Sequence, residues 1–574
     1  MGQLFIFLKK RKKLFTLIIL LLVLQSVGTL LIPFMVAILI DTGIMNADMQ
    51  AIVNVGIKMV VISLFTTLIA VGGSYLSAEF AASFGKYLRE ALFKKTQDFS
   101  IADFEAFGTS SILTRTTTDI SIIQKTIMTV LQLVIPTPLI LITAITLTAK
   151  ESGMLALIIS GFILIFIIAT GIVLSKSSKL SQFIQVRMDK INRILRESII
   201  GVRVIRAFNR SQFEKERCDT VCSEYATTMI SMNKLFAFLN PIVWLVMGLV
   251  MATVIWFGGG SVFKGSMEVG GIVSVTEYAV MALSYLILSA TSIVTIPKMH
   301  NCLERINEVL NATVTIQDKV HQTINNNILP SSVTFDKVCF SYHGAEENVL
   351  DNLTFKFEAG KTTAIIGSTG SGKSTIAKIL LRLHDIQSGQ ILLDGKNIQK
   401  YSQYDLRAKI GYVPQKAFLF SGNISDNLAM GKKGASLADM RRAIEIAQAE
   451  TFIEALPEKL NTLVAQGGTN FSGGQKQRLA IARAIIKNAG VCIFDDSFSA
   501  LDFKTDAALR KAIKANLTNA VVIIIAQRIN TIIDADQIIV LDEGKIVGIG
   551  KHNELLNSCH VYKEIAKSQL DMEG

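Results

Sequence analysis

The sequence predicts a chain in two parts: a helical membrane domain with six spans and long cytoplasmic extensions, fused to an α/β domain that carries a phosphate-binding loop. Half of the 574 residues are hydrophobic and only 18% are charged. This composition excludes a disordered, collagen-like or coiled-coil chain and indicates a membrane protein. The long apolar stretches all lie before residue 300, whereas strand and helix patterns alternate around a glycine-rich loop in the second part.

The charge balance is basic, with 58 Lys and Arg against 46 Asp and Glu, a net charge of +12. In a membrane protein this balance is explained by cytoplasmic loops that face anionic lipid. We therefore expect the lipid bilayer as a partner and no nucleic acid. Among the six cysteines only Cys218 and Cys222 are close in sequence, with no His beside them, so we expect reduced thiols and no metal cluster.

Six apolar stretches are each about long enough to cross a bilayer. The first follows five consecutive cations at residues 9–13 and is too long for a secretory signal, so we expect a retained span and a cytoplasmic N-terminus. The predicted spans are 14–40, 52–76, 126–149, 154–174, 236–257 and 271–296.

The segments between these spans differ in length and charge. Those at 41–50, 150–153 and 258–270 are short and contain few cations, whereas 80–125 and 175–235 are long, helical in pattern and rich in Lys and Arg. The positive-inside rule places the long segments in the cytoplasm. Six crossings return the chain to the same side, so we expect the second part in the cytoplasm too.

A change in amino-acid composition marks the domain boundary, because residues 322–330 are polar and rich in asparagine. We expect the membrane domain over 1–310, a linker over 311–330 and a nucleotide-binding domain over 331–574. The pattern of the last domain predicts helices over 374–383 and 475–487 and strands over 333–340, 353–357, 362–366, 491–494, 521–525 and 537–541.

Residues 367–374 read GSTGSGKS and match the pattern GxxxxGK[ST], with an apolar strand before them and a helix after them. Glycines let the backbone wrap a phosphate, and exposed amides at a helix N-terminus favour negative charge. We expect Lys373 to reach the β and γ phosphates of ATP and Ser374 to ligate Mg²⁺; an ordinary Gly/Ser loop is the alternative. The expected nucleotide contacts are Gly367, Ser368, Thr369, Gly370, Ser371, Gly372, Lys373, Ser374 and Thr375.

Asp495 follows the apolar strand 491–494, where a carboxylate can hold Mg²⁺ from the far side, as phosphoryl transfer requires. An Asp after a buried strand is common in α/β folds. The assignment therefore depends on its pairing with the phosphate loop.

Residues 471–475 read FSGGQ and resemble the signature LSGGQ of ATP-binding cassette (ABC) proteins. In that family the signature contacts the γ-phosphate of ATP held by the opposite cassette, so the resemblance implies action in trans by Ser472, Gly473, Gly474 and Gln475. Phe471 in place of Leu is a packing change. The resemblance extends to Tyr342 for the aromatic residue that stacks on adenine, Gln415 for the Q-loop and its magnesium contact, and Ser499 and Asp502 for the D-loop.

The first part resembles the membrane domain of ABC exporters. Residues 104–119 and 197–208 resemble the two intracellular loops, each of which carries a short coupling helix that docks on a cassette. Six spans followed by one cassette is the order of a half-transporter, so the resemblance implies a second chain in the working unit. Charged runs that are merely solvated helix faces are the alternative.

Two hydrolytic positions depart from the family pattern. The glutamate that polarises the attacking water is replaced by Asp496, whose carboxylate is withdrawn by ~1.5 Å, and a misplacement of about 1 Å can cost ~10²-fold in rate. The switch histidine is replaced by Gln527, which keeps hydrogen bonding without a protonatable ring. Gln466, in the loop before the signature, stands where exporters often carry Glu. This milder departure could alter the contact between the cassette and a coupling helix.

In the dimer that the resemblance implies, each ATP site combines the phosphate loop of one cassette with the signature of the other. These departures therefore affect only one of the two sites. The chain's own site, with Asp496 and Gln527, is expected to be degenerate, whereas its intact signature is fit to complete the partner's site. We therefore expect a heterodimer with a second half-transporter that carries the catalytic Glu and switch His and performs most of the hydrolysis, as in bacterial heterodimeric multidrug exporters. A homodimer with two slow sites is the alternative, because Asp can serve as a base.

The substrate is expected to be a small hydrophobic or amphipathic compound, because Phe and Met side chains adapt to many shapes. Surfaces that face lipid are also rich in Phe and Met, so a lipid-facing surface is the alternative explanation of this composition. Glu277 in the sixth span is a candidate contact for a cationic substrate, or else a carboxylate that reaches water near the outer interface. We expect a multi-pass exporter, multidrug in class, in a bacterial cell membrane. Lipid or peptide export, and an ATP-gated regulatory or channel-like role, are the alternatives.

Overall fold

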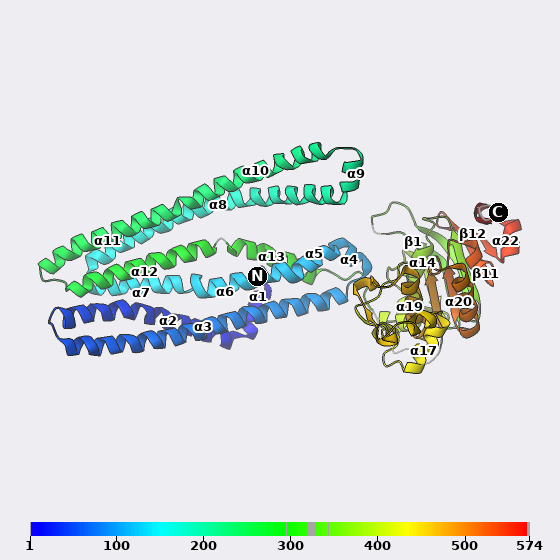
Figure 1. Cartoon of the computed structure of the whole chain (residues 1–574), viewed down its shortest axis with the longest axis horizontal. Helices are drawn as coiled ribbons and strands as arrows, with labels where there is room; N and C mark the ends of the chain where they lie inside the picture. The colour runs from blue at the N-terminus through cyan, green and yellow to red at the C-terminus, as the bar shows by residue number, and fades with distance from the viewer. Residues whose placement is uncertain (1, 294, 319–328, 343, 571–574) are drawn as a thin grey trace. The chain divides into compact units, whose positions relative to one another are not determined.

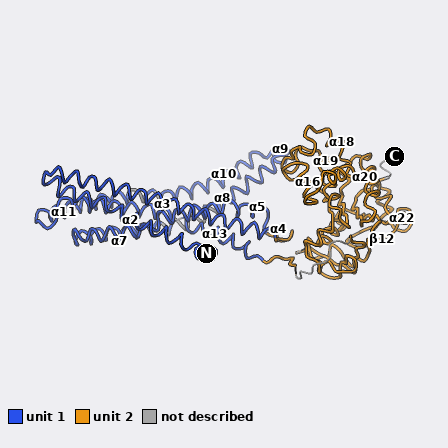
Figure 2. Tube along the Cα trace, turned by 90° about the horizontal axis from the view of Figure 1, so that it is seen from below, with its two compact units in different colours: residues 1–97, 107–312 blue, residues 98–106, 313–574 orange. Residues whose placement is uncertain are grey.

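The computed structural model describes residues 2–293, 295–318, 329–342 and 344–570. Residues 319–328, part of the linker expected over 311–330, lie outside the described residues. The chain forms two compact units: Met1–Gln97 with Phe107–Ala312, and Asp98–Ala106 with Thr313–Gly574 (Figure 2). The second unit thus includes a short segment from the first half of the sequence. The boundaries expected at 310 and 331 stay predictions.

The first unit is helical (Figure 1). Within the described residues, six helices are long and apolar enough to cross a membrane, which confirms the six predicted spans. Including the π-helical turns η1 to η3, its elements are α1 (Gly2–Lys10), α2 (Lys12–Ile38), η1 (Leu39–Ile44), α3 (Met49–Gln97), α5 (Thr109–Thr114), η2 (Arg115–Asp119), α6 (Ile120–Thr129), η3 (Val130–Val134), α7 (Pro136–Glu151), α8 (Gly153–Ile200), α9 (Val202–Ala207), α10 (Ser211–Ala237), α11 (Leu239–Phe263), α12 (Val269–Ile293) and α13 (Thr295–Asn311).

The long charged segments are helical, as expected, because α3 and α8 continue well beyond the length of a span and α10 lies in the second charged segment. The fifth span differs from its predicted bounds of 236–257. One helix ends at Ala237 and the next runs from Leu239 to Phe263. The glycines at 258–260 do not end this helix, which stops where Gly265 takes a positive φ of 67°.

Helix α12 lies at the centre of the apolar packing, against α2, α7 and α11 (Figure 1). Its buried side chains include Val275, Tyr278, Ala279 and Ala282, which follow the i, i+3, i+4, i+7 spacing of one helix face. The two alanines leave room for neighbouring helices to approach closely.

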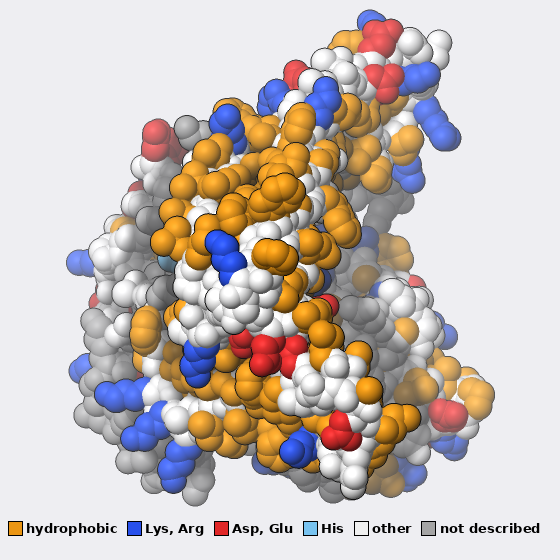
Figure 3. All heavy atoms as spheres, turned by 90° about the vertical axis from the view of Figure 1, so that its left-hand side faces the viewer, with side chains coloured by type: hydrophobic (Ala, Val, Ile, Leu, Met, Phe, Trp, Pro, Cys, Tyr) orange, Lys and Arg blue, Asp and Glu red, His pale blue; other side chains and the backbone are white. Residues whose placement is uncertain are grey.

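The short connections between spans lie at one end of this unit (Figure 1), and Figure 3 shows the molecule from that end. Hydrophobic side chains cover much of that face, and acidic side chains gather near its middle. The amide of Gly270, in the first turn of α12, donates a hydrogen bond of 2.7 Å to Oδ1 of Asp41 in η1. This bond ties the first and sixth spans together at that end.

An ion pair between a buried carboxylate and a half-exposed arginine joins α13 to the end of η2. Asp119 is 2% exposed and accepts hydrogen bonds from Nε and Nη2 of Arg305, at 2.9 and 2.6 Å. A bidentate pair of this kind fixes orientation as well as distance.

We predict that Asp119→Asn lowers the stability of the full-length chain by about 1–3 kcal/mol, because a buried charge-assisted contact is lost. The measurement is the apparent Tm in detergent. Glu90→Gln is the matched control, since Glu90 and Lys86 form a pair at 3.7 Å whose side chains are 67% and 77% exposed. Equal shifts for the two variants would contradict the prediction.

The α/β part of the second unit, residues 329–570, is called the cassette. Its six-stranded sheet has the order β12-β11-β3-β10-β9-β6, parallel except for β12. An antiparallel sheet has the order β2-β1-β4-β5, and β7 pairs with β8. The strands are β1 (Ser332–Phe340), β2 (Leu350–Glu358), β3 (Thr362–Gly367), β4 (Ser388–Leu393), β5 (Lys396–Asn397), β6 (Ile410–Val413), β7 (Gly422–Asn423), β8 (Leu463–Val464), β9 (Val491–Asp495), β10 (Val521–Ile525), β11 (Gln537–Asp542) and β12 (Lys545–Gly550).

All six predicted strands are present, and both predicted helices exist, although they end earlier than predicted, at Leu380 and Ile485. The helices of the second unit, with the 3₁₀ turns η4 to η6, are α4 (Ile101–Phe107, whose last residue belongs to the first unit), α14 (Lys373–Leu380), η4 (Ile398–Lys400), α15 (Gln403–Ala408), α16 (Ile424–Ala429), α17 (Leu437–Ile446), α18 (Glu450–Glu454), η5 (Lys459–Asn461), η6 (Gln466–Gly468), α19 (Gly473–Ile485), α20 (Phe503–Asn516), α21 (Ile529–Ile532), α22 (His552–Ser558) and α23 (His560–Leu570).

Both faces of the parallel sheet are buried. Along β9, Val491 and Ile493 pack in the core shared with the antiparallel sheet and α14, whereas Cys492 and Phe494 pack in the core formed with α17, α19 and α20. Burial on both faces explains why these strands read as continuous apolar runs.

Candidate nucleotide site

The strand order brings the predicted site residues to one edge of the sheet. β3, β10 and β9 are neighbours and parallel, so their carboxyl ends lie together. The phosphate loop follows β3, Gln527 comes two residues after β10, and Asp495 ends β9, with Asp496 next. A ligand site outside the carboxyl ends of parallel strands is the general rule for such sheets.

The shape of the phosphate loop depends on its glycines. Gly372 has a φ of 93° and precedes α14, and a Cβ there would lie 2.5 Å from Cδ2 of Leu350 and 2.9 Å from the carbonyl oxygen of Val349. Gly370 has a φ of 91° but is open around the Cβ position. Ser368, Thr369 and Gly370 are exposed, whereas Gly367, Ser371, Gly372 and Thr375 are buried.

Lys373 is directed back over the loop. Its Nζ donates hydrogen bonds to the carbonyl oxygens of Gly367 and Ser368, at 2.8 and 2.6 Å. Burial lowers the pKa of this ammonium group, which the nearby carboxylates of Asp496 and Asp495 oppose. A buried cation inside a wrapped loop, at the N-terminus of α14, fits an anionic phosphate chain.

Asp495 is 3% exposed and bridges two elements. It accepts hydrogen bonds from Oγ of Ser374 at 2.7 Å and from Oη of Tyr412 at 3.3 Å. Burial raises the pKa of this carboxyl, and the two hydrogen bonds oppose the rise. A hydroxyl and a carboxylate facing each other are the oxygen ligands that Mg²⁺ prefers. The contact of Tyr412, at the end of β6, was not predicted, although it lies three residues before Gln415.

Asp496 lies beside Gln415. Its Oδ2 accepts a hydrogen bond of 3.1 Å from Nε2 of that glutamine. Burial raises the pKa of the Asp496 carboxyl, against the effect of Gln415 and of the nearby cations Arg528 and Lys373. Its backbone is left-handed, with a φ of 47°, a conformation uncommon for residues other than glycine. The side chain of Gln527 is exposed.

Tyr342 lies alongside α14. Its Oη is 3.1 Å from Oγ1 of Thr375, Nζ of Lys378 lies 5.6 Å from its ring centroid, and its ring meets that of His384 edge-on at 5.3 Å. The half-buried ring is therefore held next to the helix that begins with Lys373.

The signature lies at the N-terminus of α19. Oγ of Ser472 accepts a hydrogen bond from the amide of Gln475, and Oε1 of Gln475 accepts one from the amide of Ser472, at 3.3 and 2.9 Å. This reciprocal cap leaves Ser472 and Gly473 exposed. Gly474 lies against the D-loop, since a Cβ there would be 3.2 Å from the carbonyl oxygen of Ala500. Ser499 bonds to the carbonyl of Asp496, and Asp502 caps α20.

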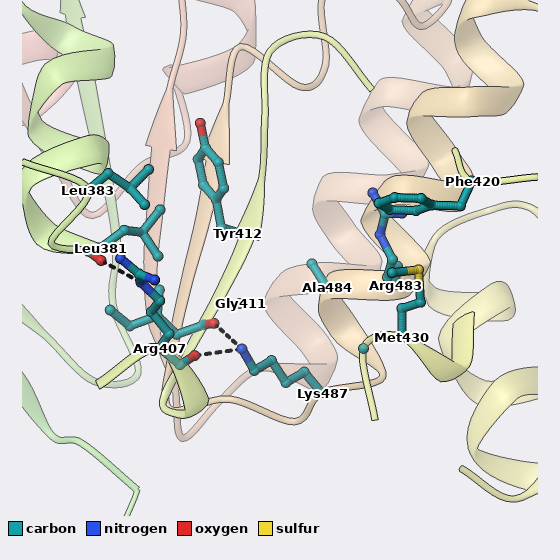
Figure 4. A pocket seen from close by; sticks show the side chains of 12 residues that line it. Leu381, Leu383, Arg407, Gly411, Tyr412, Phe420, Met430, Arg483, Ala484 and Lys487 are labelled. Atoms are coloured by element: carbon teal, nitrogen blue, oxygen red, sulfur yellow. Dashed lines mark hydrogen bonds between the residues drawn. The ribbon is translucent and has the colours of Figure 1, made fainter. Parts of the chain in front are cut away.

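A groove of about 420 Å³ opens beside β6, the strand that precedes Gln415 (Figure 4). Its wall is partly apolar, with Leu383, Phe420 and Met430, and partly basic, with Arg483 and Lys487. Nζ of Lys487 donates to the carbonyl oxygens of Arg407 and Ile410, at 2.6 and 2.8 Å. Burial lowers the pKa of both Arg483 and Lys487.

Glu277 does not belong to this unit. It lies on α12 of the helical unit, and its side chain is exposed in the single chain. Glu277 is not part of the buried face of α12 that Val275, Tyr278, Ala279 and Ala282 form.

Comparison with known proteins identifies both parts of the chain. Residues 15–286 match the ABC transporter transmembrane region, and residues 350–499 match the ABC transporter family. The ABC transporter ATP-binding protein YfiB of Bacillus subtilis is 34% identical over 568 residues, which cover 99% of this chain and 98% of that one. The ATP-dependent lipid A-core flippase of Haemophilus ducreyi is 32% identical, covering 92% and 91%. The structure of a bacterial Atm1-family ABC exporter with ATP bound matches with a TM-score of 0.80 and 26% identity, covering 97% and 98%.

The fold and the site define an ATP-hydrolysing membrane translocase. The chain belongs to the ABC transporter family and is an exporter-type half-transporter of the cell membrane.

We predict that Gly372→Ala weakens ATP binding by at least about tenfold, because the added methyl group meets backbone and Leu350 and forces the loop open. The measurement is titration of the full-length protein with a fluorescent ATP analogue. Gly370→Ala is the control: it has a similar φ but open space around it, so the loss should be smaller. Equal losses would show that backbone strain, rather than the clash, decides the effect.

Proposed function

We propose that this chain is one subunit of a heterodimeric ATP-driven exporter, with a degenerate ATP site of its own and a signature that completes the catalytic site of its partner. The observation that carries the proposal is the combination of Asp496 and Gln527 at the hydrolytic edge with an intact signature at α19. In a homodimer both sites would carry the defect.

The degenerate site binds ATP but turns it over slowly. The loop residues and Lys373 hold the phosphates, and Tyr342 stacks on adenine. Ser374, Asp495 and Gln415 would hold Mg²⁺, which when bound neutralises charge on the β and γ phosphates. Asp496 is engaged by Gln415 on a side chain one methylene shorter than glutamate, so it is poorly placed to activate water.

The signature acts on the partner's ATP. The reciprocal cap fixes Ser472 and Gln475, while the exposed helix N-terminus presents amides and a partial positive charge to an incoming phosphate. Ser499 and Asp502 of the D-loop border the same surface. These features support a site completed in trans, because Ser472 and Gly473 are exposed and accessible to a nucleotide held by another cassette.

The groove beside the Q-loop is the docking site for a coupling helix of the partner. Its apolar wall matches the exposed apolar side chains of Val202 and Val204 in α9 of this chain and of Phe208, the residue that follows α9. An equivalent helix in the partner would bury its apolar side in this groove. It would then transmit the closing movement of the cassettes to the membrane domain. ATP binding then turns the transporter outward, and hydrolysis at the partner's site resets it.

The transported substrate is hydrophobic or amphipathic, and a multidrug range is the proposed class. The relative named as a lipid A-core flippase supports an amphipathic substrate and favours lipid export as the second candidate. Glu277 would contact a cationic substrate only if the exposed face of α12 lines a cavity between the two subunits.

The test compares two variants of the assembled pair. Asp496→Asn should leave ATP turnover within about twofold of wild type, because its site is already slow. Ser472→Arg should reduce turnover to below about 5%, because the long cation blocks the partner's site. The measurement is steady-state phosphate release by the pair in nanodiscs, with Lys373→Ala as a control for loss of ATP binding at the degenerate site.

A large loss from Asp496→Asn would contradict the proposal, since it would make Asp496 a working base. It would favour a symmetric dimer in which both sites hydrolyse ATP.

A further inference from the structure

We propose that residues 313–318, called the stub, form a clamp that makes the first cytoplasmic coupling segment move together with the phosphate-loop helix, with Asp103 and Arg382 as its positioning residues. The stub, the segment Asp98–Ala106 and the cassette belong to one compact unit. The inference holds for either dimer composition, so it is independent of the proposed heterodimer.

One end of the clamp fastens the stub to α4. Asp103 is 8% exposed, and its two carboxylate oxygens accept hydrogen bonds from Oγ1 and the amide of Thr315, at 3.1 and 3.4 Å. Oγ of Ser100 lies 2.7 Å from Oγ1 of Thr315. Ser100 and Asp103 also form a reciprocal cap at the start of α4, through bonds of 2.8 and 3.2 Å. The stub therefore shares the polar groups that set the first turn of α4.

The other end fastens the stub to the end of α14. Arg382 is 3% exposed, follows α14 directly after its C-cap and has a φ of 50°. Its guanidinium donates to the carbonyl of Gln317 at 3.2 Å and pairs with Asp318 at 3.5 Å, while Asp385 and the carbonyl of Tyr401 take its remaining donors. A planar guanidinium with four acceptors is held in one orientation.

The middle of the stub is fixed as well. Ile316 is 6% exposed, its carbonyl accepts from Nε2 of Gln403 at 3.3 Å, and the carboxylate of Asp318 accepts from the Gln403 amide at 3.1 Å. A short stretch with a buried side chain and polar bonds on both sides cannot slide without breaking several contacts at once.

The clamp has a mechanical consequence. Lys373 begins α14 and Arg382 follows its end, so one rigid helix leads from the phosphates to the stub. α4 begins a few residues after the end of α3, which carries the second span. A displacement of α14 on nucleotide binding is therefore carried to α3 through Arg382, the stub and Asp103, in addition to any helix docked in the groove.

Hydrogen–deuterium exchange of the full-length transporter in nanodiscs tests this inference. In the wild type, ATP with magnesium and vanadate should slow exchange both in peptide 367–380 and in peptide 98–106. In Asp103→Asn and Thr315→Val, peptide 367–380 should respond as before, whereas the response of 98–106 should fall to less than about a third, because the contact that carries it is lost. Thr313→Val is the matched control, since Thr313 is an exposed threonine in the same stub.

An unchanged response of 98–106 in both variants would overturn the inference, as would a wild-type protein in which only 367–380 responds. Because the two peptides are read in the same sample, loss of folding or of ATP binding is distinguished from loss of the clamp.

A cross-link gives a second, independent test. In the double variant Ser100→Cys, Thr315→Cys, the two thiols would be close enough to form a disulfide, because the hydroxyl oxygens that they replace lie 2.7 Å apart. If α4 and the stub move as one body, oxidation should leave ATP turnover within about twofold of the reduced protein. Strong inhibition that reductant reverses would show that the two separate during the cycle and would overturn the inference.

Discussion

The structure of the ATP site depends on one buried carboxylate. Asp495, at the end of β9, accepts a hydrogen bond from Ser374 at the start of α14 and another from Tyr412 at the end of β6. This group therefore ties together the phosphate loop, β6, which leads to Gln415, and β9, which Asp496 follows. Its burial is costly for a charge and raises the pKa of this carboxyl, and the two hydrogen bonds oppose that rise. A cation in this position would complete the compensation.

The same edge of the sheet would account for the division of labour between the two ATP sites of the proposed heterodimer. Asp496 and Gln527 follow neighbouring strands, so both departures fall on one side of the cassette. The signature lies on α19, where a local cap rather than the sheet sets its geometry. Changes at the strand ends can thus weaken the chain's own site while its contribution in trans is preserved, which is the physical basis of the proposed asymmetry.

Much of this arrangement could be predicted from the sequence, because its signals are local. Apolar length gave the six spans, and the loop at 367–374 between a strand and a helix located the phosphate site. Strands β4, β6 and β12 were missed because they are short or mixed in character, and their place is decided by pairing with distant strands. The contact of Tyr412 with Asp495 and the clamp between Asp103 and Thr315 join residues far apart in sequence, so no local pattern marks them.

The most direct test of the central claim is ATP turnover by this chain purified alone and again after co-expression with a second half-transporter that carries the catalytic Glu and switch His. The account predicts little turnover alone and an increase of at least about tenfold in the pair. Robust turnover by the chain alone would contradict it, because Asp496 and Gln527 would then suffice for hydrolysis.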